Sequence, residues 1–495
     1  MLTLLTTTEN LSKIWEDIRS VDRLEELLTV VTDIHLWDEK NKLLLFENNQ
    51  LRAPLDWHDT EPPYIFPPIE YSKARFLALV FYKLGNPQSA IQQLDKADVL
   101  YPHLQLAIHL QFQSPIPQQA LLFVEKQTLH NQCIVQHYGY LPQHKSPESL
   151  VALYEKAIAK AENDTLPIFT LKQYGNLLLD LQQYAVLEKL LRKHYALAIS
   201  ETATNALNVL LARVLMEQLT IPYPTTVLEE IMALQEKNIA YYESKGLTVN
   251  AALVLIDASE VANFQKDYVL SKTYINKAIL YFKEAEIPEF LGEAGLRKAT
   301  LLYTWSKDGS PQYYKPAINA FQDVLKIFKR DTHPKQFADI HHHLALIYSE
   351  IPVAPDEKPL WTAFCASSFK EVLNFYTQEK YPYEFAQVCH NYATALMNFP
   401  EAKLHNNLDK AFDLFEAALQ IRTKKDYPLE RALSLLNQLE LYWLMHNEDE
   451  TAEQSKFKQM IEKANAVADL VSDSQLIQQA EQHLEQLEHL KTLIH

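Results

Sequence analysis

Four prolines recur at nearly equal intervals in the second half of the chain. They are Pro288, Pro334, Pro382 and Pro428, and their spacings are 46, 48 and 46 residues. The stretches PKQFADIHHHLALIY and PYEFAQVCHNYATAL, which start at the second and third of them, align without a gap. Proline suits the first turn of a helix, because the N–H that it lacks would have no partner there. The interval therefore predicts a tandem array of helix pairs, with a proline at the start of each new pair.

The residues upstream of each proline are also in register. The position seventeen residues before the proline is always small, and the position thirteen before it is always large: Ser271, Ala317, Cys365 and Ala411, then Ile275, Phe321, Phe369 and Phe415. A spacing of four places both positions on one face of a helix. We expect the small side chain to let a neighbouring helix approach closely, while the large one fills the space beside it.

Glycine is scarce, with 7 residues in a chain of 495, where average usage would give about 35. Tight hairpins and phosphate-binding loops depend on glycine. The deficit therefore predicts an all-α fold without a nucleotide-binding loop. The formal net charge of −17 repels a phosphate backbone and argues against nucleic acid as a partner.

Cysteine usage and hydropathy point to the compartment. Cys133, Cys365 and Cys389 are too few and too scattered for a disulfide framework. The sequence shows neither a signal peptide nor an apolar run long enough for a membrane span. We therefore expect a cytoplasmic protein.

The segment 71–104 is a shorter unit, and the longer units carry the same spacing of small and large residues in their second helix. Its 34 residues hold, in order, Leu77, Ala78, Phe81, Ala90, Leu94, Ala97 and Pro102. This pattern resembles the tetratricopeptide repeat, and the units that begin at the four prolines look like enlarged copies of it. The resemblance implies a right-handed α-solenoid, in which the first helices of successive pairs line a concave groove that binds a peptide or protein.

The patterns divide the chain into five parts. We expect an N-terminal helical cap with a proline-rich connector in residues 1–68, a tetratricopeptide unit with an irregular insert in 69–145, degenerate helix pairs in 146–262, enlarged repeats in 263–473 and a capping helix in 474–495. The connector ends in EPPYIFPP, residues 61–68. It is either a cover over the first helices, which we favour, or a proline motif for a partner.

The resemblance also implies which residues line the groove, because ligand contacts in this family come from fixed positions of the first helix. Arg75 and Lys83 hold such positions in the N-terminal unit. In the enlarged units the positions hold Tyr303, Asp339, His342, Leu346, Gln387, His390, Thr394, Met397, Leu436, Glu440 and Trp443. We expect Met397 and Trp443 to be apolar anchors. The alternative for Trp443 is packing beneath the C-terminal cap.

One cysteine–histidine cluster has to be weighed as a metal site. His130, Cys133 and His137 share one face of a predicted helix, at a spacing that zinc ligands use. An amphipathic helix with a buried cysteine gives the same pattern, and we prefer that interpretation. We expect no metal and no cofactor.

The other histidines of interest lie in the repeats. Residues 341–343 are consecutive histidines, which point about 100° apart in a helix and cannot converge on one ion. His342 shares its repeat position with His390, and the two are candidates to face each other across adjacent helices.

These observations predict a non-enzymatic scaffold or adaptor that holds a partner protein or peptide in a concave groove. The alternative is a regulatory subunit or peptide sensor that inhibits or activates a partner enzyme, such as a protease or phosphatase. The sequence leaves the identity of the partner and the oligomeric state open.

Overall fold

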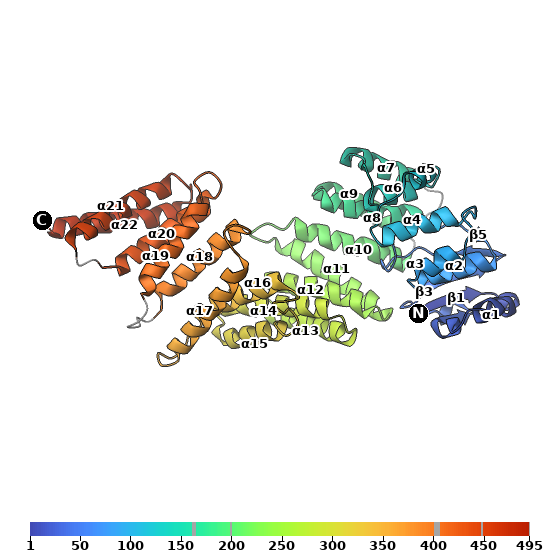
Figure 1. Ribbon diagram of the computed structural model, residues 1–495, viewed down its shortest axis with the longest axis horizontal. Coiled ribbons are helices and arrows are strands. Elements are labelled where there is room, and N and C mark those ends of the chain that lie inside the picture. The colour runs from blue at the N-terminus through green and yellow to red at the C-terminus, as the bar shows by residue number, and fades with distance from the viewer. Residues whose placement is uncertain (161–164, 199, 400–405, 447–448, 495) are drawn as a thin grey trace. The chain divides into compact units, whose positions relative to one another are not determined.

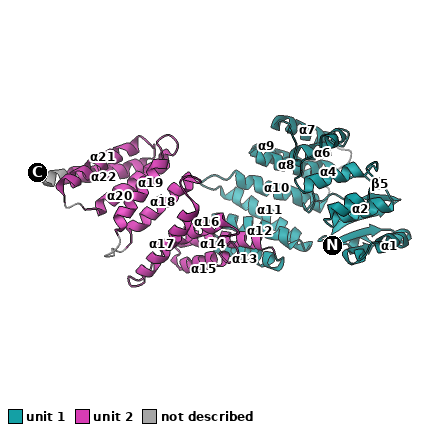
Figure 2. Cartoon of the chain, viewed as in Figure 1, with its two compact units in different colours: residues 1–286 teal, residues 287–495 magenta. Residues whose placement is uncertain are grey.

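The computed structural model describes residues 1–160, 165–198, 200–399, 406–446 and 449–494. Over these residues the chain forms twenty-two α-helices in tandem and a five-stranded sheet near the N-terminus (Figure 1). The predicted helical repeat fold is confirmed. The chain divides into unit 1, Met1–Glu286, and unit 2, Ile287–His495, so the division falls inside the predicted 263–473 segment (Figure 2). None of the helices in the described ranges has both the length and the apolar character needed to cross a membrane.

The N-terminal residues correct the prediction of an all-α chain with a helical cap. They form β1 (Leu2–Thr6), β2 (Leu28–Val31), β3 (Lys42–Glu47), β4 (Gln50–Arg52) and β5 (Ile69–Glu70), in the order β2-β1-β3-β4-β5. Strand β1 lies between β2 and β3 in the sheet and runs parallel to both, and α1 (Leu11–Arg19) lies between β1 and β2 in the chain. Leucine-rich runs of five or six residues are too short for a stable helix, but they suit strands whose two faces are both covered.

The low glycine content was a poor argument against hairpins, because in this hairpin asparagine adopts the turn conformation that glycine usually adopts. Strands β3 and β4 are antiparallel and joined by Asn48 and Asn49 alone. Both asparagines have a positive φ, of 51° and 58°. A two-residue hairpin turn requires this conformation, and asparagine tolerates it better than other side chains do.

The helices of unit 1 follow the sheet. They are α2 (Lys73–Lys83), α3 (Pro87–Gln92), α4 (Tyr101–Gln111), α5 (Gln118–Val124), α6 (Leu129–Tyr138), α7 (Pro147–Ala159), α8 (Leu166–Asp180), α9 (Tyr184–His194), α10 (Glu201–Glu217), α11 (Thr225–Ser244), α12 (Thr248–Phe264) and α13 (Tyr268–Glu284). The first helices of successive pairs, α2, α4, α6 and α8, are neighbours in that order. We call the surface that they share the first-helix face of unit 1.

Two details of unit 1 differ from the predictions. Residues 105–145, expected to be irregular, contain most of α4 and all of α5 and α6, because Pro115 and Pro117 fall between helices and interrupt none. The second helix of the 71–104 unit, α3, has only six residues. The first and second helices of successive pairs thus still follow one another here, but several of these helices are shorter than the family pattern implies.

Unit 2 contains α14 (Pro288–Lys307), α15 (Tyr314–Val324), α16 (Pro334–Glu350), α17 (Lys358–Phe375), α18 (Pro382–Met397), α19 (Asn407–Ile421), α20 (Pro428–Leu444), α21 (Glu450–Ala468) and α22 (Ser474–Ile494). Each of the four recurring prolines is the first residue of a helix, as predicted. The small and large positions upstream are buried: Ala317, Cys365, Ala411, Phe321, Phe369 and Phe415 are all 0% exposed.

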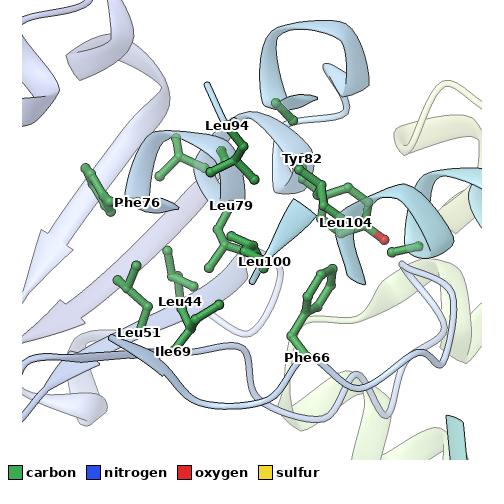
Figure 3. Close-up of a cluster of buried hydrophobic side chains, with 14 of the residues drawn as sticks. Leu44, Leu51, Phe66, Ile69, Phe76, Leu79, Tyr82, Leu94, Leu100 and Leu104 are labelled. Atoms are coloured by element: carbon green, nitrogen blue, oxygen red, sulfur yellow. The ribbon is translucent and has the colours of Figure 1, made fainter. Parts of the chain in front are cut away.

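One hydrophobic core joins the sheet to the helices of unit 1. Leu44 and Leu51 come from the strands, Phe76 and Leu79 from α2, and Phe66 from the chain between β4 and β5 (Figure 3). All five are buried. The sheet is therefore an integral part of unit 1, and it fixes both ends of the segment between β4 and β5.

Candidate functional site

Residues 53–68 connect β4 to β5 and run across the first-helix face of unit 1; we call them the self-bound loop. A turn at its start is closed by Asp56, whose carboxylate accepts hydrogen bonds from the backbone N–H of His58 at 3.1 Å and of Glu61 at 2.6 Å. The Thr60 hydroxyl donates to the same carboxylate at 3.0 Å. Long ordered loops of this kind are uncommon in compact folds and are usually functional.

Helix α6 binds the backbone of the self-bound loop. The Asn131 side chain accepts a hydrogen bond from the Ile65 N–H at 2.9 Å and donates one to the Ile65 carbonyl at 2.8 Å. His130 donates from Nε2 to the Pro63 carbonyl at 2.8 Å, while its Nδ1 accepts from the Thr170 hydroxyl at 2.9 Å. Burial lowers the pKa of His130 to about 4, so the ring is neutral. The loop is held as an extended peptide is held by a receptor.

The side chains of the loop contact the other first helices. The Tyr64 hydroxyl lies 2.8 Å from Nδ1 of His103 on α4. The Phe66 ring lies 5.4 Å from that of Tyr82 on α2, and the Trp57 ring 5.1 Å from that of Phe169 on α8. The loop therefore contacts α2, α4, α6 and α8.

Two ion pairs complete the attachment of the loop. Lys172 on α8 donates to the Asp59 carboxylate and to the Trp57 carbonyl, each at 2.8 Å. Lys83 at the end of α2 donates to Glu61 at 2.8 Å. Aromatic, amide and charged side chains of four helices together hold one segment.

Both predicted ligand contacts of unit 1 bind other residues of the same chain. Lys83 donates to Glu61 of the loop. Arg75 instead pairs with Asp98 at 3.0 Å and donates to the Glu70 carbonyl at 3.1 Å, which ties α2 to β5 and to the turn before α4. Of the two interpretations of EPPYIFPP, the structure shows the cover over the first helices.

The candidate metal ligands of α6 do not converge. His130 is engaged by the loop, and Nδ1 of His137 lies 2.8 Å from the Tyr154 hydroxyl. Cys133 is fully buried, and burial raises the pKa of its thiol to about 12. Across the described ranges, no group of three or more His, Cys, Asp or Glu residues is arranged to hold a metal ion.

Successive first helices of unit 2 are joined by histidine–asparagine pairs. Nε2 of His342 on α16 lies 3.0 Å from the Asn391 amide nitrogen on α18, and that of His390 on α18 lies 3.4 Å from the Asn437 amide nitrogen on α20. Asn437 also donates to Thr394 at 3.0 Å. His342 and His390, the candidates to face each other, thus each lie against an asparagine of the next first helix.

The asparagines of these pairs were missed as partners, although the repeat alignment holds the signal. Asn391 and Asn437 each lie nine residues after a helix-starting proline, one position beyond the histidine site. Burial lowers the pKa of both His342 and His390 to about 4, so each ring is neutral and accepts from the amide.

Several predicted groove residues of unit 2 are occupied by contacts within the chain. Tyr303 is buried and donates to Glu350 at 2.8 Å. Asp339 accepts hydrogen bonds from Lys335 at 2.9 Å and from Tyr376. Leu436 is buried in the hydrophobic core that includes α20 and α22. These side chains hold the first helices of unit 2 in place, and they leave little surface for a ligand.

Trp443 also makes its contacts within unit 2. Its indole N–H donates to Nδ1 of His483 on α22 at 2.9 Å, and Glu440 lies 3.3 Å from Nε2 of the same histidine. Helix α22 neighbours α20 where a further first helix would stand. The structure thus favours the second interpretation of Trp443, packing beneath the cap, over the role of a ligand anchor.

The exposed part of the face lies near the helix starts. On α18 Tyr383 is 39% exposed and Gln387 is exposed, while on α20 Leu429 and Leu433 are 49% and 38% exposed. Each pair is spaced by four residues, so its members lie on one side of the helix. Leu346, Thr394 and Met397 further along are half-buried. We call Tyr383, Gln387, Leu429 and Leu433 the open patch of unit 2.

Comparison with known proteins adds little to this picture. No protein-family model and no curated protein matches the sequence. Among solved structures, a circular tandem repeat protein with novel repeat topology is 12% identical, with a TM-score of 0.20 over 84% of this chain and 88% of that one. Yeast Tom70 is also 12% identical, with a TM-score of 0.23 over 85% of this chain and 96% of its own.

Proposed function

We propose that the chain is an interaction scaffold of the tetratricopeptide type, which performs no catalysis and binds an extended segment of a partner protein on the open patch of unit 2. The bound loop in unit 1 carries this proposal. In that unit the first-helix face already holds an extended segment, through paired amide bonds from Asn131 to Ile65 and aromatic contacts to Tyr64 and Phe66. The same arrangement of helices supplies the same kind of surface in unit 2.

The composition of the open patch fits an extended peptide. Tyr383, Leu429 and Leu433 offer apolar and aromatic surface, and Gln387 offers an amide that can both donate and accept. In the described ranges Gln387 is exposed and Tyr383, Leu429 and Leu433 are 38% to 49% exposed, which contrasts with the covered face of unit 1. The net charge of −17 favours a protein partner over nucleic acid.

A peptide display selection against the purified chain tests the proposal. Selected peptides should bind the wild type, and Leu433→Asp should weaken that binding by about 2 kcal/mol, close to thirtyfold, because interface centres carry most of the energy. Leu360→Asp is the matched control, since Leu360 is 56% exposed on the second helix α17. Equal losses in the two variants, or none in either, would place the binding surface elsewhere.

A further inference from the structure

We infer that unit 2 holds a binding site for a small, neutral aromatic molecule, in a pocket between the second helices α15 and α17. Helix α16 packs against both of these helices and contributes the floor of the pocket (Figure 1). The pocket has a volume of about 470 Å³, and we call it the inter-helix pocket. Cavities of this size hold small molecules, and the space between packed helices is a common place for them.

A difference between successive repeats explains why this pocket is open. Ser368 on α17 lies fourteen residues before the next helix-starting proline, and the same position of the following unit holds Leu414. Leu414 packs against the cluster that includes Cys389, whose counterpart at the pocket is His341. Because serine is much smaller than leucine, the space that Leu414 fills in one repeat is left empty in the repeat before it.

A second difference makes the wall of the pocket aromatic. Phe364 lies eighteen residues before the proline, where the following unit has Lys410. Lys410 donates to the Tyr392 hydroxyl at 3.0 Å, and its ammonium lies 4.7 Å from the centre of that ring. Phe364 has no such polar contact to make, and it stays 45% exposed. The chain thus closes one space with its own lysine and leaves the other lined by a ring.

Three aromatic rings stand together on this wall. The ring of Tyr348 lies 5.6 Å from that of Trp361 and 5.7 Å from that of Phe364, and the last two are 6.0 Å apart. Ile318 and Leu344 add aliphatic surface. A further ring can stack on these rings or meet them edge to face, which stabilises it beyond the burial of its area. The wall therefore favours an aromatic ligand.

Polar groups of the pocket are left without partners. Ser368 is 5% exposed, and in the described part of the chain its hydroxyl makes no hydrogen bond. Nδ1 of His341 is also buried without a partner there. A buried hydroxyl that makes no hydrogen bond is costly, so a ligand group that donates or accepts beside Ser368 gains free energy. The amide of Asn319, which is exposed on α15, offers a further contact at the rim.

The charges of the lining favour a neutral ligand. Among the described residues that line the pocket none carries a carboxylate, and the one ammonium group, that of Lys315, is exposed on α15. Burial lowers the pKa of His341, so its ring is neutral near pH 7. A charged ligand group inside the pocket would lose its hydration without gaining an ionic partner. An amide or phenol on an aromatic body fits the lining best.

Calorimetric titration of the unmodified protein with three probes tests this inference. Indole-3-carboxamide carries both the ring and a neutral polar group, indole-3-carboxylate replaces that group by an anion, and acetamide lacks the ring. We expect measurable binding of the first and at least about tenfold weaker binding of the other two. Equal or tighter binding of the carboxylate or of acetamide, or no heat with indole-3-carboxamide, overturns the proposal.

Substitutions locate the site. Ser368→Leu fills the pocket as Leu414 fills the next space, so binding should fall at least about tenfold. The urea midpoint should stay at or above that of the wild type, because filling a cavity adds contacts. Leu433→Asp in the open patch should leave the binding of indole-3-carboxamide unchanged, which separates this site from the one proposed for a partner peptide.

A second variant keeps the test decisive if Ser368→Leu does not fold. Phe364→Ala removes one ring of the wall and should weaken binding about fivefold or more. Phe112→Ala is its matched control, since Phe112 is 53% exposed in unit 1, and it should change nothing. Undiminished binding in the pocket variants that fold refutes the location, and an equal loss in Phe112→Ala does the same.

Discussion

The two units use the same face of their helices in opposite ways. In unit 1 the face of α2, α4, α6 and α8 is covered by residues 53–68 of the chain itself, which the sheet delivers from both ends. In unit 2 the corresponding helices are joined to each other by His342–Asn391 and His390–Asn437. Tyr383 and Leu433 stay exposed there. A helical-repeat face thus becomes either an internal support or a surface for a partner, depending on what the flanking chain supplies.

Acid should destabilise both units more than any single substitution does. His103 and His130 in unit 1, and His342 and His390 in unit 2, have a pKa lowered by burial to about 4. The unfolded chain takes up protons near the ordinary pKa of about 6.5, so the stability present above that pH is lost as the pH falls toward 4. At pH 5 the loss reaches up to about 4 kcal/mol per unit.

Urea denaturation followed by circular dichroism at pH 7 and pH 5 measures this loss. His390→Gln keeps a neutral side chain that hydrogen-bonds but does not titrate, so it should reduce the pH dependence of unit 2 alone. An unchanged pH dependence in this variant would show that His390 is not buried as a neutral ring.

Removing the loop anchor should expose the covered face of unit 1. Asn131→Ala leaves the N–H and the carbonyl of Ile65 without their partners, at a cost of about 3 kcal/mol. Chymotrypsin should then cut after Tyr64 under native conditions, because the loop opens. Asn437→Ala is the control in unit 2, and the loop should stay protected in that variant. Equal protection of the loop in both variants would count against the anchoring role of Asn131.

Overpacking should affect unit 2 without touching the loop. Ala411 is 0% exposed on α19, at the position that is small in every copy. Ala411→Leu inserts extra volume into this contact and should cost about 2 kcal/mol in the free energy of unfolding. A denaturation midpoint that stays within error of the wild type would mean that the repeat phase derived from the prolines is misassigned.

The smallest expected effect concerns the cap of unit 2. Trp443→Phe keeps the ring packed against α22 but removes the hydrogen bond to His483, which should cost about 1 kcal/mol. Peptides selected for the open patch should bind this variant as they bind the wild type. A large loss of peptide affinity would restore Trp443 as a ligand anchor and move the binding surface toward α22.

Much of unit 2 was predictable because its information is local. Proline at the first turn marks the start of a helix whatever the fold around it, and the small and large positions before each proline are fixed by packing between neighbours. The N-terminal sheet was not predictable in this way, since runs such as LTLLT fit a short buried strand and a helix segment equally well. The run LTLLT becomes a strand only because it pairs with β3, which lies far along the chain.

The contacts between the self-bound loop and its helices were even less predictable from the sequence. Lys83 was identified from its repeat position, but its partner Glu61 was not, because no pattern in one sequence links a loop to the helices that hold it. Asn131 looked like an ordinary helix residue between two candidate metal ligands. Its role depends on the position of Ile65, which is set by β4 and β5 together.

The path of the self-bound loop has a consequence for how the protein is made. Trp57 and Lys172, which meet at 2.8 Å, are separated by 115 residues, whereas His342 and Asn391 in unit 2 are separated by 49. A ribosome releases Trp57 well before α8 exists to supply Phe169 and Lys172, so this aromatic side chain is exposed to the cell in the nascent chain. We therefore expect unit 1 to depend more on chaperones during synthesis than unit 2, whose helices mostly contact near neighbours in the sequence.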